Sequence, residues 1–370
     1  MKKTLLSFFA LLCFTLIFGQ KDNLWTPAKN LTNKEIKANK RAISTPTLFN
    51  LDVDKLKQIV SESPRKTTKL SKSAVIVSFP ISESEFQNFS IYKTSNFSPE
   101  LEAAHPEIAT YYGESVDGKS AKIYFSLSPL GLSSMQLRLG KEAVFVEPYD
   151  NNNSTYVVYK KSDKGISKNK FECATSAKSS TDGLKMGKIL SADDGLLRTY
   201  RLALSCTGEY TQYFGGTKAL ALAAMNNTMT RVNGVFENDF AIRLVLIPEQ
   251  ENIIFTSAST DPYSNATAGA DGAWNTELMN VLHGTTYGIG DSKFDIGHLF
   301  GASGGGGSAG CIGCVCSNDT TTDSYGPLAY KGSGFTSPGD NIPSGDSFDI
   351  DYVAHEIGHQ FGANHTFTRA

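Results

Sequence analysis

The sequence predicts an α/β protein with two domains, the first mostly antiparallel β and the second made of alternating strands and helices. Between residues 73 and 173, short stretches of β-branched and aromatic residues are separated by Gly, Asn, Pro and Asp. After residue 195 the pattern becomes strand, helix, strand. The charge changes at the same place: residues 195–370 hold 8 Lys and Arg against 17 Asp and Glu, whereas residues 21–194 hold 25 against 20.

The N-terminus has the pattern of an export signal over residues 1–20. Lys2 and Lys3 precede an apolar run over residues 5–18, which is too short for a comfortable membrane span. We therefore expect a secreted, extracellular chain with no membrane partner after signal removal. Residues 21–72 are basic, polar and without periodicity, and are predicted to be poorly ordered. No basic groove with aromatic residues is apparent, so no nucleic-acid partner is expected.

The expected elements follow from periodicity and from the residues that interrupt it. In the first domain we predict strands at residues 74–80, 121–127, 135–139, 143–146 and 156–159. A Ser-, Thr-, Lys- and Gly-rich linker occupies residues 174–194. In the second domain, which spans residues 195–370, we predict strands at 198–206, 241–247 and 294–300 and helices at 217–236 and 271–283.

A cluster of three histidines close to the end of the chain predicts a metal site. His355 and His359 are four residues apart, so both rings can lie on one helix face and bind one metal ion. Glu356 lies beside these ligands and can act as general base toward a water in the open fourth position. Gly362 can adopt the left-handed conformation that ends a helix, which lets His365 reach the same ion.

The helix that carries this motif is predicted from its flanking residues. Asp346 or Ser347 can cap its N-terminus, and Asp349 and Asp351 suit the positive end of its dipole. A buried stripe is expected at Ile350, Val353, Ile357 and Phe361. A His-Glu-x-x-His string alone often marks only a polar helix face, but the added glycine and third histidine favour a zinc site.

The string at residues 355–365, with residues 347–354 before it and Thr366 and Phe367 after it, resembles the metzincin zinc metalloproteases of the bacterial reprolysin-like group. The pappalysin and cytophagalysin branch is the second choice, because Thr366 stands where reprolysins of the snake-venom type usually carry Asp. The resemblance implies a twisted mixed sheet with packed helices and an active-site helix, a β propeptide domain over residues 73–173, and Zn²⁺. It also implies that the strand at 294–300 is the sheet edge to which an extended peptide substrate adds.

Metzincins also carry a methionine turn after the third histidine. This chain has no Met after Met279, so we expect the catalytic domain over residues 195–370 to be incomplete, ending before that turn.

Five cysteines remain once the predicted signal is removed: Cys173, Cys206, Cys311, Cys314 and Cys316. Export favours disulfides among the last four, one of which can run to Cys206, with the pairing left open. Cys173 is then a free thiol, and a thiolate can occupy the open metal position. This would resemble the cysteine switch of latent metalloproteases, with the propeptide as partner. The alternatives are an ordinary unpaired cysteine or an intermolecular link.

Two further features are expected to have structural rather than catalytic roles. His298 lies far from the completed triad in the sequence and is expected to be a core or edge histidine. The glycine-rich residues 301–310 lack the Lys-Ser/Thr of a phosphate loop and are predicted to form a flexible loop near the cleft.

The function predicted from these observations is a secreted zinc-dependent endopeptidase made as a latent zymogen. Its ligands would be His355, His359 and His365, its general base Glu356, and its substrates proteins or peptides. Two alternatives stay open. One is an exported noncatalytic fragment or a binding or inhibitory module, because the methionine turn is missing. The other is a zinc hydrolase that acts on a non-peptide amide.

Overall fold

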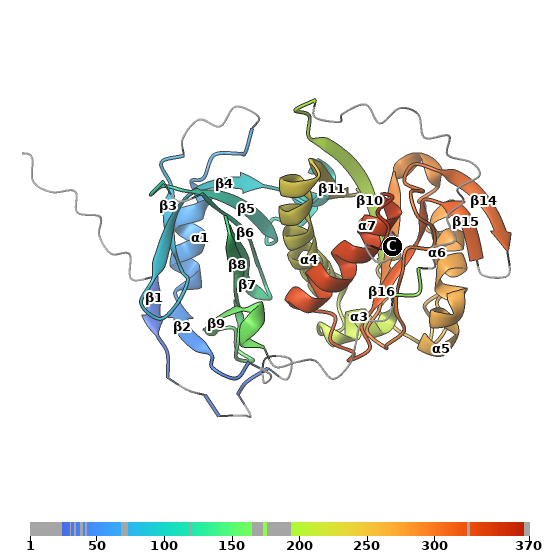
Figure 1. Cartoon of the computed structure of the whole chain (residues 1–370). Coiled ribbons are helices and arrows are strands. Elements are labelled where there is room, and N and C mark those ends of the chain that lie inside the picture. Colours follow the sequence, from blue (N-terminus) through green and yellow to red (C-terminus); the bar gives the residue numbers. More distant parts are fainter. Residues whose placement is uncertain are drawn as a thin grey trace, which may run out of the picture.

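The computed structural model of the chain describes residues 24–29, 31–32, 35–37, 40, 43–67, 73–118, 120–164, 173–175, 194–323 and 326–365. Figure 1 shows two bodies side by side, one built from β1 to β9 and the other from β10 onward. The predicted signal at residues 1–20 lies outside the described residues, as does most of the predicted linker.

The first body is a nine-stranded antiparallel sheet with the order β1-β2-β9-β8-β7-β6-β5-β4-β3. Its strands are β1 (Trp25–Pro27), β2 (Thr47–Leu51), β3 (Ile76–Pro80), β4 (Phe86–Thr94), β5 (Ala109–Ser115), β6 (Ala121–Ser128), β7 (Gly131–Arg138), β8 (Lys141–Pro148) and β9 (Thr155–Lys160). The five strands expected here are confirmed, as β3, β6, β7, β8 and β9. Because each of β5 to β9 pairs with its sequence neighbour across a short connection, these connections set their register.

The sheet curls so that its first and last strands approach one another, with the indole nitrogen of Trp25 donating a hydrogen bond to the carbonyl of Ser78 over 2.8 Å. Helix α1 (Val53–Ser61) is capped by Asp52 and buries Leu56 and Val60 in the core that the sheet encloses. Where residues 21–72 are described, they contain these elements, although the sequence predicted poor order for the segment. The segment is rich in lysine, but its few apolar residues recur where a strand and a helix can bury them.

The second body is a five-stranded sheet with the order β11-β10-β12-β16-β13. Its strands are β10 (Arg198–Cys206), β11 (Ile242–Leu246), β12 (Ile296–Phe300), β13 (Gly306–Ser308) and β16 (Gly332–Ser337). Strands β10, β11, β12 and β16 run parallel, and β13 is antiparallel to β16. A separate hairpin pairs β14 (Asn318–Asp323) with β15 (Gly326–Tyr330).

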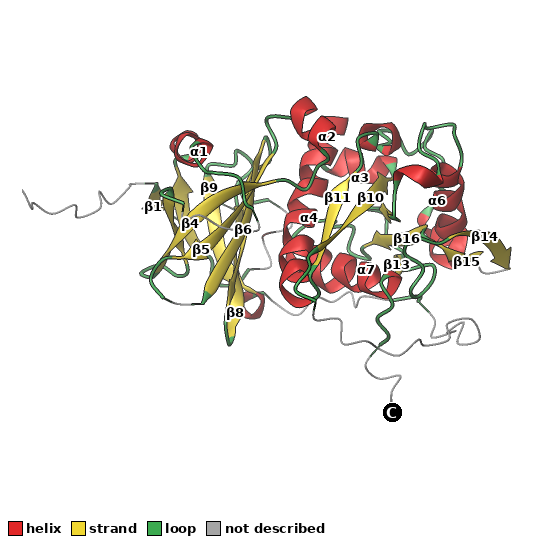
Figure 2. Ribbon diagram, turned by 90° about the horizontal axis from the view of Figure 1, so that it is seen from above, coloured by secondary structure: helices red, strands yellow, loops and turns green. Residues whose placement is uncertain are grey.

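Helices cover both faces of this sheet, as Figure 2 shows. The helices of this body are α3 (Gly208–Tyr213), α4 (Lys218–Asp239), α5 (Ala266–Ala268), α6 (Trp274–His283) and α7 (Ala354–Gln360), with α2 (Pro99–Ala104) reaching it from the first body. Alternate side chains of β10 point to opposite faces of the sheet. Leu202 and Leu204 pack with α4 and α7, whereas Ala203 packs with α6. The predicted strand-helix-strand unit is therefore confirmed as β10, α4 and β11. Within the described ranges, no helix is both long and apolar enough to span a bilayer.

The edge of the sheet lies elsewhere than predicted. Strand β12, expected at the edge, is the central strand and every one of its residues is buried. The edge is β13, within the glycine-rich segment that was expected to be a flexible loop. The sequence of β13 lacks the β-branched and aromatic residues that mark strands, because Glu356 of α7 leaves no room for a Cβ at Gly307 and because Gly306 has φ of +76°.

A buried arginine joins the two bodies. Arg231, on α4, contacts Glu147 of β8 at 2.5 Å and Asp349 at 2.9 Å. Asp349 lies in the π-helical stretch η6 (Ser347–Val353) that leads directly into α7. Asp346, the predicted cap, makes no capping bond and pairs with Lys164 of the first body. Asp349 does lie in the first turn, as predicted, but its carboxylate is bound by Arg231 of α4 in the same body. Asp346 stands at the cap position, but its carboxylate is bound by Lys164 of the first body instead of the helix N-terminus.

Replacing this arginine should destabilise the whole chain. We expect Arg231→Leu to lower the free energy of unfolding by about 3–5 kcal/mol, since it leaves Asp349 buried without its cation. Denaturant unfolding of the full chain measures the effect. The control is Lys161→Ala, which removes the exposed ion pair with Asp351 and should cost less than about 1 kcal/mol. Equal, small losses in the two variants would contradict a joining role for Arg231.

Candidate metal centre

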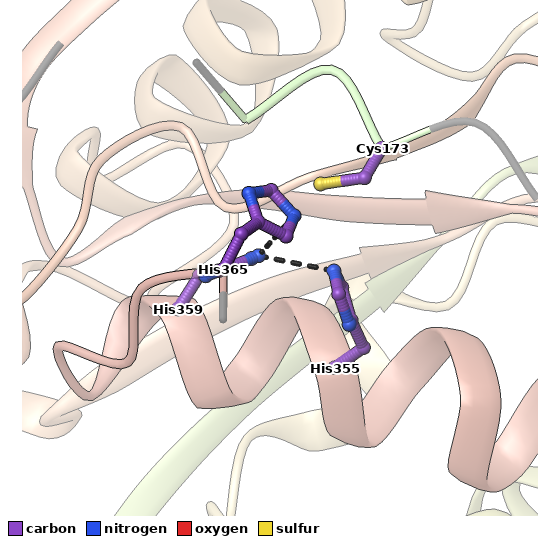
Figure 3. Close-up of side chains that lie close together, drawn as sticks. All are labelled: Cys173, His355, His359 and His365. Atoms are coloured by element: carbon purple, nitrogen blue, oxygen red, sulfur yellow. Dashed lines mark hydrogen bonds between the residues drawn. The ribbon is translucent and has the colours of Figure 1, made fainter. Parts of the chain in front are cut away.

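The helix α7 presents two of the three predicted ligands on one face. The Nε2 atoms of His355 and His359 lie 3.0 Å apart, as their four-residue spacing predicts. The opposite side of the helix is anchored in the core, where Val353 and Ile357 of the predicted stripe are fully buried. Figure 3 shows both rings pointing to the same side, toward His365.

A tight turn after α7 returns the third ligand to the site. Gly362 has φ of +104° and its N–H donates to the carbonyl of His359 over 2.8 Å, which confirms the predicted left-handed helix end. Ala363 N–H closes the turn on the carbonyl of Gly358. The Nε2 atom of His365 then lies 3.1 Å from that of His359.

The environment of His355 and His359 favours the neutral form of both imidazoles. Nδ1 of His359 lies 2.6 Å from the carbonyl of Ala363, so Nδ1 donates its proton there and leaves Nε2 free. Burial, together with the neighbouring imidazoles of His359 and His365, lowers the pKa of His355 to about 4. Burial also lowers the pKa of His359. Neutral imidazoles are the form that binds metal ions.

Cys173, which precedes the second body in the sequence, supplies a fourth donor atom. Cys173 is half-buried, and one donor atom from each of Cys173, His355, His359 and His365 lies within 4.8 Å of the others. In Figure 3 the sulfur of Cys173 points toward the imidazoles. Burial raises the pKa of the Cys173 thiol to about 12, and nearby Glu356 adds to the rise, so the isolated thiol is neutral. A bound cation would favour the thiolate.

The donor set fits a metal ion. Imidazole nitrogen and cysteine sulfur are both zinc ligands in tetrahedral sites, in which nitrogen ligands lie about 2.0–2.1 Å from the metal. Such a tetrahedron separates its nitrogen atoms by roughly 3.3 Å. The measured separations of 3.0 and 3.1 Å are close to that value.

Glu356 is enclosed beside the three histidines. It is fully buried, its Oε2 accepts a hydrogen bond from Thr175 Oγ1 at 3.0 Å, and Oε1 has no hydrogen-bond partner among the described residues. Burial raises the pKa of Glu356 to about 7, although the polar neighbours Cys173 and Thr175 oppose the rise. A carboxyl group with this pKa can both take up and release a proton near neutral pH.

The backbone of β13 lies so close to Glu356 that a side chain at position 307 would not fit between them. A Cβ atom on Gly307 of β13 would lie 2.6 Å from Oε1 and 2.7 Å from Cγ of Glu356. The backbone of β13 therefore reaches the site only because position 307 is glycine. Its outward backbone groups are occupied by the segment 173–175: Ala174 N–H donates to Gly307 O, and Ala309 N–H donates to Thr175 Oγ1, both over 2.8 Å.

His298 supports the site from the core, as expected for a structural histidine. It is fully buried, and burial lowers its pKa to about 4. Its Nδ1 lies 2.9 Å from Gln360 Oε1, while Gln360 Nε2 donates to Gly297 O at 2.9 Å. These bonds fix the end of α7 to β12. Gln360, Gly307 and Thr175 were missed from the sequence, because only their three-dimensional neighbours reveal their roles.

The cysteines of the second body are partly paired. Cys311 and Cys314 form a disulfide, which confirms that a disulfide is present. Cys206 is a free, buried thiol, so the possibility of a bond to it is not realised, and Cys316 is free and exposed. The disulfide loop contacts the site through Gly313, whose N–H donates to the carbonyl of His359 at 3.0 Å.

The α/β fold, the three converging imidazoles and the buried carboxylate are together the arrangement of a metallopeptidase. Residues 197–369 match the family model described as Metallo-peptidase family M12B Reprolysin-like. This part of the chain is similar to the reprolysin-like metallopeptidases, which confirms the resemblance noted from its motif. The members of this family depend on a metal, which is usually zinc.

Several solved structures match the chain. One of them is metalloproteinase-II from Bacteroides fragilis, with 14% sequence identity, coverage of 85% of this chain and 86% of that chain, and a TM-score of 0.45. No curated protein matches the sequence.

The close approach of β13 gives a direct test of the site geometry. We expect Gly307→Ala to lower the free energy of unfolding by about 1–3 kcal/mol, because the buried Glu356 side chain has no room to move away. The control is Gly358→Ala within the motif, where a Cβ would meet no atom within 4 Å. That variant should be neutral or stabilised by up to about 1 kcal/mol, as for alanine in a helix. Denaturant unfolding compares the two variants. A Gly307→Ala chain as stable as the wild type would contradict the close approach of β13 to Glu356.

Proposed function

We propose that the chain is a secreted zinc-dependent endopeptidase made as a latent zymogen. The observation that carries the proposal is the convergence of His355, His359 and His365 beside the buried Glu356, in a segment that is similar to a metallopeptidase family. The export signal predicted at residues 1–20 supports secretion.

The three imidazoles would hold Zn²⁺. Zinc, when bound, would polarise the scissile carbonyl and lower the pKa of a water molecule. Glu356 then serves as general base, accepting a proton from that water and passing it to the leaving amine. Its burial removes competing solvent, and its position next to His355 on the helix fixes the carboxylate relative to the reacting atoms.

Peptides are the proposed substrates because the site lies beside β13, the edge strand of the sheet. Gly307 O and Ala309 N–H of the β13 segment are the backbone groups that now bond to residues 174 and 175. An extended peptide can use the same acceptor and donor once these residues leave. Backbone recognition of this kind tolerates many side chains, which suits an endopeptidase.

Latency is proposed from the position of Cys173 and from the charge of the first body. Cys173 supplies a fourth donor atom, which would fill the position that catalysis needs open. Basic residues of the first body pair with acidic residues of the second, as in Lys66 with Glu237 and Lys164 with Asp346. These contacts support the role of the nine-stranded sheet as the chain's own inhibitory propeptide.

The proposal is tested by zinc content and casein cleavage of the full chain after its linker is nicked. We expect one equivalent of zinc, and cleavage that a chelator abolishes. Glu356→Gln should keep the zinc and lose roughly 10²–10⁴-fold in rate, because it removes the proton acceptor alone. His359→Ala should lose both zinc and cleavage.

The outcomes separate the competing functions. Zinc binding without cleavage of casein or of a peptide library would favour a noncatalytic module, and turnover restricted to small amides would favour a non-peptide hydrolase. Unchanged cleavage in Glu356→Gln would rule out its role as general base.

Latency has a separate test in the uncleaved, zinc-loaded chain. Cys173→Ala should raise peptide hydrolysis at least about tenfold, the change produced when the closed form loses about 1.4 kcal/mol. Cys316→Ala is the matched control, since Cys316 is also a free cysteine but is exposed and outside the donor cluster. A fluorogenic peptide measures the rate, and gel analysis verifies that the linker is intact. Equal rates in both variants would contradict the cysteine switch.

A further inference from the structure

Thr175, two residues after Cys173, reaches the other functional group of the site. Its Oγ1 lies 3.0 Å from Glu356 Oε2 and 2.8 Å from Ala309 N, and the side chain is buried. A hydroxyl group has one hydrogen and two lone pairs. Because it accepts a hydrogen bond from Ala309 N–H, its single hydrogen is left for Glu356.

The backbone of the same segment explains how two side chains reach two targets. Ala174 N–H donates to Gly307 O, and Cys173 forms a parallel bridge with Gly307. In an extended segment successive side chains point to opposite sides. Cys173 and Thr175 therefore face the site, whereas Ala174 points away and is exposed.

We propose that Thr175 is a second latency residue, which occupies a carboxylate oxygen of Glu356 while Cys173 occupies the open metal position. The proposal rests on the proposed function, in which Glu356 is the general base. With Oε2 bonded to the threonine hydroxyl, this oxygen of Glu356 is withheld from a water molecule even if the thiol leaves the metal. When residues 173–175 leave the site, Oε2 of Glu356 and the N–H of Ala309 are freed together.

The two contacts are distinguishable because each acts on a different catalytic group. Replacing the cysteine alone opens the metal position but leaves Glu356 engaged, so Cys173→Ala retains part of the latency. Thr175→Val keeps the shape of the side chain and removes its donor and acceptor. The closed form then contains an unpartnered buried carboxylate oxygen and an unpartnered N–H, which destabilise it.

The first experiment measures peptide hydrolysis by uncleaved, zinc-loaded full chains, each compared with its own nicked form. Cys173→Ala should stay several-fold below its nicked form. Adding Thr175→Val should raise the rate of the uncleaved chain by roughly tenfold, whereas adding Thr175→Ser, which retains the hydroxyl, should not. Equal rates for the Val and Ser double variants would overturn the proposal, as would a Cys173→Ala chain as active as its nicked form.

The second experiment needs no catalysis. Alkylation of Cys173 by iodoacetamide is followed by peptide mass analysis in uncleaved, zinc-loaded wild-type, Thr175→Val and Thr175→Ser chains. Thr175→Val should react roughly tenfold faster than the other two, because its closed form is less stable. Equal rates in all three would overturn the proposal. Absence of hydrolysis in every nicked chain would instead count against the proposed function, and the alkylation rates would still decide the role of Thr175.

Discussion

The position of the metal-site helix depends on a buried arginine shared by two carboxylates. Arg231 extends from α4 and contacts Glu147 in the first body and Asp349 in the second. Asp349 also accepts a hydrogen bond from Thr228 at 2.7 Å, so the stretch leading into α7 is fixed from two points of α4. Desolvated charges of this kind are costly unless all are paired, which makes the arrangement specific to one relative placement of helix and sheet.

The features that sequence reasoning recovered are those that depend on local geometry. His355 and His359 share a face because of helix periodicity, and the turn at Gly362 follows from the conformational freedom of glycine. The unit formed by β10, α4 and β11 was likewise evident from its periodicity. A metal site of this type can therefore be predicted from the sequence alone, since most of its ligands lie within eleven residues.

The features that were missed depend on tertiary contacts. Asp346 and Asp349 are of a residue type that often stands at a helix N-terminus. Their ion pairs with Lys164 and Arg231 can be seen only in the folded chain. Strand β13 has no propensity signal, because the space in front of Glu356 leaves no room for a side chain at position 307. The order of parallel strands is set by crossover connections, so β12 could not be distinguished as central rather than edge.

Inhibitor and substrate are expected to compete for one surface. The segment 173–175 contacts β13 through backbone bonds that any extended chain can form, and adds two side chains that a substrate would lack. On the proposed function, selectivity for the closed state would reside in Cys173 and Thr175 rather than in the strand pairing.

The first body covers the five-stranded sheet at its opposite edge as well. The amide of Leu246 on β11 donates to Asn96 O at 2.8 Å, and Ser98 N–H donates to Leu246 O at 2.9 Å. Loss of the first body would consequently open two edges at once, and an open edge pairs with any extended backbone it meets. At β13 that backbone would be a substrate. At β11 it can be the same edge of another molecule, so the proposed maturation would bring a tendency toward self-association.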